Sequence, residues 1–197
     1  MSQCLTIAID PGERLSGLAL FDSGCHIGCT AVFKLSEASA IQALRLLLWQ
    51  VARGWVPGEI EVAIETWTNP ANRSAIESLA YARRTWQAAC RAIEIPDGNV
   101  HLVNSTTWQS AVLGRGYKSV GGTKRASMLV AAQLVGLKGR QNLTEDEADA
   151  VCLGHWFILA GGVAGATNRA SRKAEKKKGV AAQRESAMDV YRRRGVI

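Results

Sequence analysis

Short apolar runs along the chain have the length and composition of buried strands, and turn-forming residues bound them. The runs are Leu5–Asp10, Gly17–Asp22, His26–Lys34, Glu61–Glu65 and Val100–Val103. The turn sequence Asp22-Ser23-Gly24 joins the second run to the third, which predicts an antiparallel meander for the first three. The two later runs alternate with helix-like segments, as parallel strands do. The pattern therefore predicts a mixed α/β sheet and not a fully parallel one.

Between these runs, apolar residues recur at the spacing of amphipathic helices. In the segment Ser36–Arg53, Ile41, Leu44 and Leu48 share one face, and Gly54 ends the pattern. A capping-box spacing at Thr106-Thr107-Trp108-Gln109 predicts a helix that runs to about Leu113. Further helices are expected over Asn72–Ile95, Thr123–Val135 and Thr144–Leu159. Four glycines within residues 114–122 predict a mobile loop.

The length and composition indicate one globular domain with an appendage. The chain has 197 residues, of which 47% are hydrophobic, enough for a sizeable core. A glycine-rich stretch over 161–165 predicts that the folded domain, residues 1–163, ends there and that residues 164–197 form an extension. No apolar run is long enough to span a bilayer, and the N-terminus does not read as a signal peptide. The five cysteines predict reduced thiols in a cytoplasmic protein.

The net charge of +7 is unevenly placed. Residues 164–197 hold ten basic and three acidic residues, so they account for the whole excess, and residues 1–163 are neutral. A basic arm on a neutral domain indicates a polyanionic partner, most simply nucleic acid. A solvated tail that only aids solubility is the alternative, and a protein partner for the tail is also open.

Four acidic residues lie on elements that should be buried. Asp10 and Glu65 each end an apolar strand run, and Asp146 and Asp149 begin the last helix. A buried carboxylate is costly unless it is paired or binds a metal, so three core elements that each carry one predict a shared cation site. The carboxyl ends of parallel strands form the edge at which open α/β sheets carry their sites.

The chemistry of such a site follows from its ligands. Carboxylate oxygens alone suit Mg²⁺ or Mn²⁺ and not zinc. Two such ions about 4 Å apart are a common device for hydrolysing a phosphodiester. The helix pair leaves one choice open, because helix capping explains Glu145 and Glu147, and periodicity does not separate Asp146 from Glu145 as the partner of Asp149.

A cationic segment and one aromatic residue are candidate nucleic-acid contacts. The segment covers residues 113–125 and includes the first residues of the helix over 123–135. Its glycines and cations suit a loop that binds a phosphate backbone. Its candidate contacts are Arg115, Tyr117, Lys118, Lys124 and Arg125. An ordinary surface loop is the alternative. Trp67, two residues after Glu65, could wedge against a base or could belong to the core.

These pieces resemble the RuvC family of Holliday-junction resolvases, in the RNase H-like superfamily, over about residues 4–160. The matching motifs are Ile9-Asp10-Pro11-Gly12 followed by Gly17, Ala63-Ile64-Glu65, Gly114-Arg115-Gly116 with Lys124, and Asp146-Glu147-Ala148-Asp149-Ala150-Val151. The resemblance implies an RNase H-like fold with a five-stranded mixed sheet of three antiparallel and two parallel strands, flanked by helices. It also implies a homodimer, divalent metal, and paired nicks in branched DNA such as four-way junctions. It selects Asp146 over Glu145 and places Lys124 near the scissile phosphate.

Three features depart from the family pattern. The family's aromatic lies slightly further past the glutamate than Trp67, the loop before Lys124 holds more glycines than usual, and the basic tail extends beyond a typical core domain. Phage-encoded relatives vary in such features, so strict junction selectivity does not follow from the resemblance.

Other functions remain open on the residues alone. The same four acids could serve a YqgF-like RNA-processing nuclease, and a non-catalytic protein that binds branched DNA is a third possibility. An actin-like kinase is excluded because the chain is too short for two such domains. The predicted helix over 72–95 could pair two copies through an apolar stripe, or the stripe could simply cover the sheet. Its members are Ile76, Leu79, Ala80, Arg83, Trp86 and Cys90.

Overall fold

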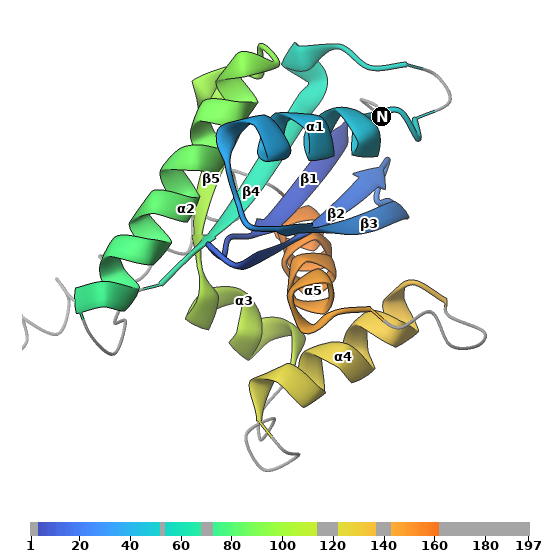
Figure 1. Cartoon of the computed structure of the whole chain (residues 1–197). Coiled ribbons are helices and arrows are strands. Elements are labelled where there is room, and N and C mark those ends of the chain that lie inside the picture. Colours follow the sequence, from blue (N-terminus) through green and yellow to red (C-terminus); the bar gives the residue numbers. More distant parts are fainter. Residues whose placement is uncertain (1–3, 52–53, 68–72, 114–121, 137–142, 162–197) are drawn as a thin grey trace, which may run out of the picture. The chain divides into compact units, whose positions relative to one another are not determined.

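A five-stranded sheet forms the centre of the domain in the computed structural model, which describes residues 4–51, 54–67, 73–113, 122–136 and 143–161 (Figure 1). The strands are β1 (Leu5–Asp10), β2 (Leu15–Asp22), β3 (Cys25–Phe33), β4 (Ile60–Thr66) and β5 (Val100–Asn104). Their order across the sheet is β3-β2-β1-β4-β5. The β1–β2 and β2–β3 pairs are antiparallel, and the β1–β4 and β4–β5 pairs are parallel. The predicted meander and the predicted mixed sheet are both confirmed.

Helices cover both faces of this sheet. The helices α1 (Glu37–Leu48) and α2 (Arg73–Ala92) lie on one face, and α3 (Ser105–Val112), α4 (Thr123–Leu134) and α5 (Glu145–Leu159) lie on the other (Figure 1). Because side chains alternate along a strand, Leu5, Ile7 and Ile9 of β1 join α1 and α2 in the main core. Asp10 follows the opposite alternation, so it belongs to the face that carries α5.

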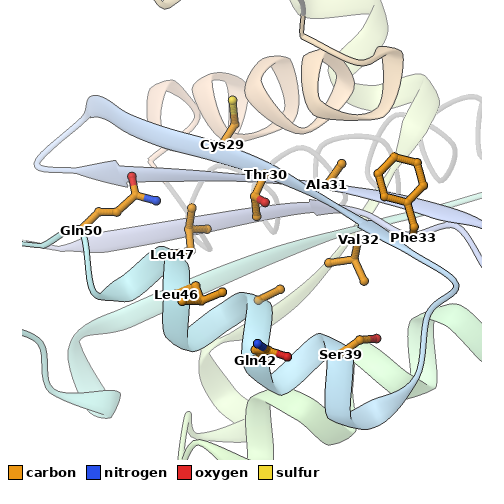
Figure 2. Close-up of a pocket in the computed structure, with 11 residues that line it drawn as sticks. Cys29, Thr30, Ala31, Val32, Phe33, Ser39, Gln42, Leu46, Leu47 and Gln50 are labelled. Atoms are coloured by element: carbon orange, nitrogen blue, oxygen red, sulfur yellow. The ribbon is translucent and has the colours of Figure 1, made fainter.

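The same alternation is visible where α1 packs against the edge strand β3 (Figure 2). Thr30 and Val32 point toward α1, whereas Cys29, Ala31 and Phe33 point to the other side of the strand. A groove of about 340 Å³ lies between the strand and the helix. On the α1 side Val32 is buried, whereas Phe33 on the other side is exposed.

The helix α5 packs closely on β1 and β2 because two glycines leave room for it. A Cβ atom on Gly17 of β2 would lie 2.0 Å from the backbone oxygen of Asp146. A Cβ atom on Gly154 of α5 would lie 2.2 Å from the ring of Phe21. The inner face of α5 carries Leu153, Trp156 and Phe157, and all three are buried.

Helix ends show where local sequence signals succeed and fail. The predicted capping role of Glu147 is confirmed. The Thr144 hydroxyl accepts a hydrogen bond from the Glu147 backbone N–H, and the Glu147 carboxylate accepts one from the Thr144 N–H, so the two residues form a capping box. The capping box predicted at Thr106 is wrong. The side chain of Asn104, the last residue of β5, accepts a hydrogen bond from the Thr106 N–H and caps α3 instead. Asparagine is among the preferred N-cap residues, and a strand end supplies the extended backbone that a cap needs.

The remaining helices agree with the predictions to within a few residues, apart from α1, which ends at Leu48 and not at Arg53. All five cysteines are free thiols. Within the described residues, no helix is long and apolar enough to cross a membrane. The predicted loop over 114–121 and the extension over 164–197 lie outside the described residues, so the predicted domain boundary stays a prediction.

Candidate active site

Two of the four predicted acids meet at the carboxyl edge of the sheet. In the parallel β1–β4 pair, Ile9 lies opposite Ile64. Asp10 and Glu65 are the next residues on the two strands, so they are neighbours on the same face. Asp10 is 8% exposed and Glu65 is 2% exposed, which makes both of them buried acids at strand ends.

The other two acids reach the same edge from α5. Gly17 pairs with Asp10 across the β1–β2 ladder, and its missing Cβ lets the backbone of Asp146 approach that strand. Asp146 and Asp149 lie one turn apart in the first half of α5. The charges of Asp146 and Asp149 both raise the pKa of Asp10. The structure therefore brings residues from β1, β4 and α5 into one electrostatic cluster.

Each member of this cluster resists ionisation in the free protein. Burial raises the pKa of Asp10 well above its ordinary range, and the neighbouring Glu65 charge adds to the effect. Burial, followed by the charge of Asp149, raises the pKa of Glu65 to about 8. Burial raises the pKa of Asp149 to about 6, although the nearby Ser127 hydroxyl opposes this. Burial also raises the pKa of Asp146. Perturbed acids that share one site are typical of functional centres.

The ligand chemistry of the cluster fits a divalent cation. Its donors are carboxylate oxygens, the ligands that Mg²⁺ and Mn²⁺ prefer. The Oδ1 atom of Asp149 is buried and has no hydrogen-bond partner, so it is a free acceptor in a site with surplus negative charge. Among the described residues, no group of three or more His, Cys, Asp or Glu side chains already stands in a metal-binding arrangement. A bound cation would have to draw the carboxylates Asp10, Glu65, Asp146 and Asp149 together.

The charge of Lys124 acts on three of the four acids in this cluster. It lies at the start of α4, and its positive charge lowers the pKa of Asp10, Asp146 and Asp149. Its Nζ donates to the carboxylate of Glu145, a pairing that raises the pKa of the lysine. Glu145 is therefore occupied by a surface ion pair, whereas Asp146 acts on Asp10.

The other predicted nucleic-acid contacts are only partly described. Arg125 is exposed beside Lys124. Trp67 is 51% exposed, so the alternative in which it belongs to the core is wrong. Arg115, Tyr117 and Lys118 lie outside the described residues.

A buried tryptophan that the sequence pattern did not predict as a site residue holds Glu65. The indole Nε1 of Trp108 on α3 donates a hydrogen bond of 2.9 Å to Oε2 of Glu65, and Trp108 is fully buried. This bond favours the ionised carboxylate and partly offsets the effect of burial on its pKa. The signal in the sequence was weak, since an apolar Trp in a short helix is more often only a packing residue.

A second missed network shapes the turn after Asp10. The Ser16 hydroxyl accepts hydrogen bonds from the Gly12 N–H at 3.0 Å and from the Trp86 Nε1 at 3.1 Å, and it donates to the Gly12 carbonyl at 2.7 Å. Gly12 has no room for a side chain, because a Cβ would lie 2.0 Å from the carbonyl oxygen of Leu15. The network fixes the backbone directly beyond Asp10.

Comparisons with known proteins place this fold. No protein-family model and no curated protein sequence matches the chain. A solved structure of T. thermophilus RuvC in complex with a Holliday junction substrate is similar at 17% identity, with a TM-score of 0.60, over 82% of this chain and 97% of that one. A second Thermus thermophilus RuvC structure is similar at 18% identity, with a TM-score of 0.56, over 80% and 95% of the two chains. At the level of its fold, the chain is RuvC-like, as the resemblance in its motifs implied.

Proposed function

We propose that the chain is a divalent-metal-dependent endonuclease that resolves four-way DNA junctions by paired nicks. The observation that carries this proposal is the cluster of Asp10, Glu65, Asp146 and Asp149, which three core elements hold at one edge of the sheet. The likeness of the fold to RuvC, one structure of which holds a Holliday junction substrate, supports the choice of substrate.

The four carboxylates would hold two Mg²⁺ ions, or Mn²⁺ in their place. Bound divalent ions supply an activated water and stabilise the leaving oxygen of a phosphodiester. The chain's own residues then have separate tasks. Trp108 orients the carboxylate of Glu65, and Lys124, once released from Glu145, contacts the phosphate. A lysine is suited to that task because its ordinary pKa of 10.5 keeps the side chain charged at neutral pH.

Paired nicks require two active sites, so we propose that two copies act together. Part of the apolar stripe on α2 does not need a partner, because Trp86 and Cys90 are buried in the main core. Ile76 remains 50% exposed at the other end of the helix. A sedimentation experiment at micromolar concentration tests the pairing, and a monomer in the presence of junction DNA would contradict it.

The test of the proposal is cleavage of a synthetic four-way junction in Mg²⁺ by the wild type and by Asp10→Asn. We expect the substitution to lower the cleavage rate by about a thousand-fold, because removal of a metal ligand takes away several kcal/mol of transition-state stabilisation. Junction binding should survive, since the cationic surface is unchanged. Asp97→Asn is the matched control, because Asp97 is an exposed acid paired with Arg91 and it is remote in sequence from every member of the cluster.

Two experimental outcomes would contradict the proposal and favour a different function. Asp10-dependent cleavage of structured RNA, with four-way DNA junctions left intact, would indicate the YqgF-like alternative. Tight junction binding without metal-dependent cleavage would indicate a non-catalytic DNA-binding protein.

A further inference from the structure

The helix α4 meets α5 through small buried residues next to the carboxylate cluster. Ser127 and Ala131 lie one turn apart on α4, and both are fully buried. On α5, the thiol of Cys152 donates a hydrogen bond of 3.6 Å to the backbone carbonyl of Ser127. Asp149 lies three residues before Cys152, so the two side chains share one face of the helix. The face of α5 that carries Asp149 therefore packs on α4 at Ser127.

One oxygen of Asp149 is left unsatisfied at this interface. Its Oδ1 atom is buried and has no hydrogen-bond partner among the described residues. A carboxylate that ligates a metal is usually hydrogen-bonded as well, because the bond fixes its orientation. If one oxygen of Asp149 binds a cation, the other oxygen still needs a donor, since an ionised carboxylate accepts bonds at both oxygens. A cation-bound Asp149 therefore requires a hydrogen-bond donor from a neighbouring element.

The hydroxyl of Ser127 is suited to be that donor. It donates to the backbone carbonyl of Thr123 at 2.9 Å, and its hydrogen-bonding contact with Asp149 lowers the pKa of that carboxyl against the larger effect of burial. A hydroxyl has one proton, so it serves only one of these two acceptors at a time. The Thr123 carbonyl does not depend on it, because the regular α-helical donor to that carbonyl is the Ser127 backbone N–H. The hydroxyl is therefore free to change its acceptor.

We propose that Ser127 is a positioning residue of the metal site, and that its hydroxyl turns from the Thr123 carbonyl to the Asp149 carboxylate when a divalent cation binds. The inference rests on the function proposed above, specifically on its metal site. The hydroxyl would hold the Asp149 oxygen that does not ligate the cation. Trp108 already holds an oxygen of Glu65 in the same manner. Two of the four carboxylates would then each be oriented by a neutral donor from the helix beside them.

The experiment measures the affinity of the DNA-free protein for Mn²⁺, by titration with detection of unbound Mn²⁺ by electron paramagnetic resonance. Ser127→Ala should weaken the affinity by about ten-fold, because loss of a bond that orients a metal ligand typically costs about 10–100-fold. Ser127→Cys keeps most of the side-chain volume but offers only a weak donor, so it should lose about as much affinity. Wild-type affinity in Ser127→Cys would assign the effect to packing and overturn the proposal.

Thr85→Val is the matched control for the loss of a buried helix hydroxyl. Thr85 is buried, and its hydroxyl makes the same kind of bond, to the carbonyl of Tyr81 four residues earlier, at 3.0 Å. Its helix α2 lies on the other face of the sheet from α4 and α5 (Figure 1). The control should therefore keep the wild-type affinity for Mn²⁺. An equal loss of affinity in Thr85→Val would contradict a specific role for Ser127.

A double-mutant cycle shows whether Ser127 acts through Asp149. In an Asp149→Asn background, Ser127→Ala should change the affinity for Mn²⁺ by less than about two-fold, because the carboxylate that the hydroxyl positions is gone. In a Trp108→Phe background, the same substitution should keep its effect of about ten-fold, because Trp108 orients a different ligand. An undiminished effect in the Asp149→Asn background would overturn the proposal, since a merely structural role of Ser127 does not need the carboxylate.

The absence of DNA from these titrations separates the inference from the nuclease function. Equal Mn²⁺ affinities of the wild type and Ser127→Ala would overturn the positioning role even if Asp10-dependent cleavage of junctions is found. Mn²⁺ binding that depends on Ser127, without cleavage of any junction, would contradict the nuclease function and support the positioning role. A wild-type protein that binds no Mn²⁺ would contradict both.

Discussion

At the scale of a single residue, two opposing effects act on the pKa of Glu65. Burial and the charge of Asp149 favour its neutral form, whereas the indole N–H of Trp108 favours the carboxylate, and the net result is a raised pKa. A carboxylate that is hard to ionise in the free protein gains from a cation, because the cation removes the repulsion that raised its pKa. The hydrogen bond then fixes which oxygen remains free for that cation.

Trp108→Phe is therefore expected to weaken metal binding more than it weakens the fold. Removal of a hydrogen bond that orients a ligand typically lowers metal affinity by about 10–100-fold, and about a ten-fold rise in the Mg²⁺ concentration for half-maximal cleavage is the expected result. Trp156→Phe is the matched control, because Trp156 is also a buried indole but its Nε1 has no hydrogen-bond partner. Equal Mg²⁺ requirements in the two variants would contradict the orienting role.

The raised pKa of Glu65 predicts how stability depends on pH in the absence of metal. The folded protein binds more protons than the unfolded chain between pH 4.5, the ordinary pKa, and about pH 8. The free energy of unfolding should therefore fall as pH rises through this window, because folding must then bury a charge. Glu65→Gln should reduce that fall and stabilise the protein at pH 8 by about 1–3 kcal/mol.

Urea denaturation at pH 5 and pH 8 in a chelator checks this expectation. Glu77→Gln is the control, since Glu77 is an exposed acid paired with Arg73 on α2. The control should keep the wild-type pH dependence. If the stability of Glu65→Gln had the same pH dependence as that of the wild type, Glu65 would ionise normally in the folded protein.

The packing of α5 on β2 sets the geometry of the site at the scale of elements. Asp146 reaches Asp10 only because Gly17 lets the two backbones approach. Gly17→Ala forces a Cβ against the backbone oxygen of Asp146, so α5 must shift. Such overpacking typically costs about 1–3 kcal/mol. A shift of about 1 Å at the carboxylates can lower a rate by about a hundred-fold.

Thermal unfolding and junction cleavage together measure this effect. Gly58→Ala is the matched control, because a Cβ at Gly58 meets no atom within 4 Å. We expect the control to keep both stability and activity. Cleavage by Gly17→Ala at the wild-type rate would mean that the position of α5 does not matter to the chemistry.

Charge is the dominant feature at the scale of the whole molecule. Residues 1–163 are neutral and hold an acidic cluster, while residues 164–197 carry the net charge of +7. An acidic site repels DNA by itself, so bound cations and basic residues must reverse the local field before a phosphate approaches. The basic extension accounts for the whole net positive charge of the chain.

Removal of residues 164–197 should therefore weaken junction binding and make it less sensitive to salt. The slope of log K against log salt concentration should become shallower by about 0.9 for each phosphate that the extension neutralises in the full-length protein. Fluorescence anisotropy between about 50 and 200 mM salt measures this slope. An unchanged slope would indicate that the extension binds no phosphates and serves another partner.

The sequence alone determined the strands, most of the helices, and the positions of the acids at the ends of two strands and at the start of the last helix. These features depend on local periodicity. A strand such as Leu5–Asp10 and the acid at its end can be recognised from a few consecutive residues. The resemblance in motifs also selected Asp146, which a helix pattern by itself could not separate from Glu145. The cap predicted at Thr106 was wrong, because Asn104 at the end of β5 caps α3 instead.

Only the tertiary structure decided which residues meet across the chain. Trp108 and Glu65 are 43 positions apart, and the close approach of Gly17 to Asp146 joins a strand to a helix near the other end of the domain. In the sequence Arg83 is one position of an apolar stripe, and packing places it in the lining of the same pocket of about 310 Å³ as Glu65. Periodicity specifies which face of a helix or strand is buried, but it does not specify which other element packs against that face. That partner is set by side-chain shape and by the space that residues such as glycine leave open.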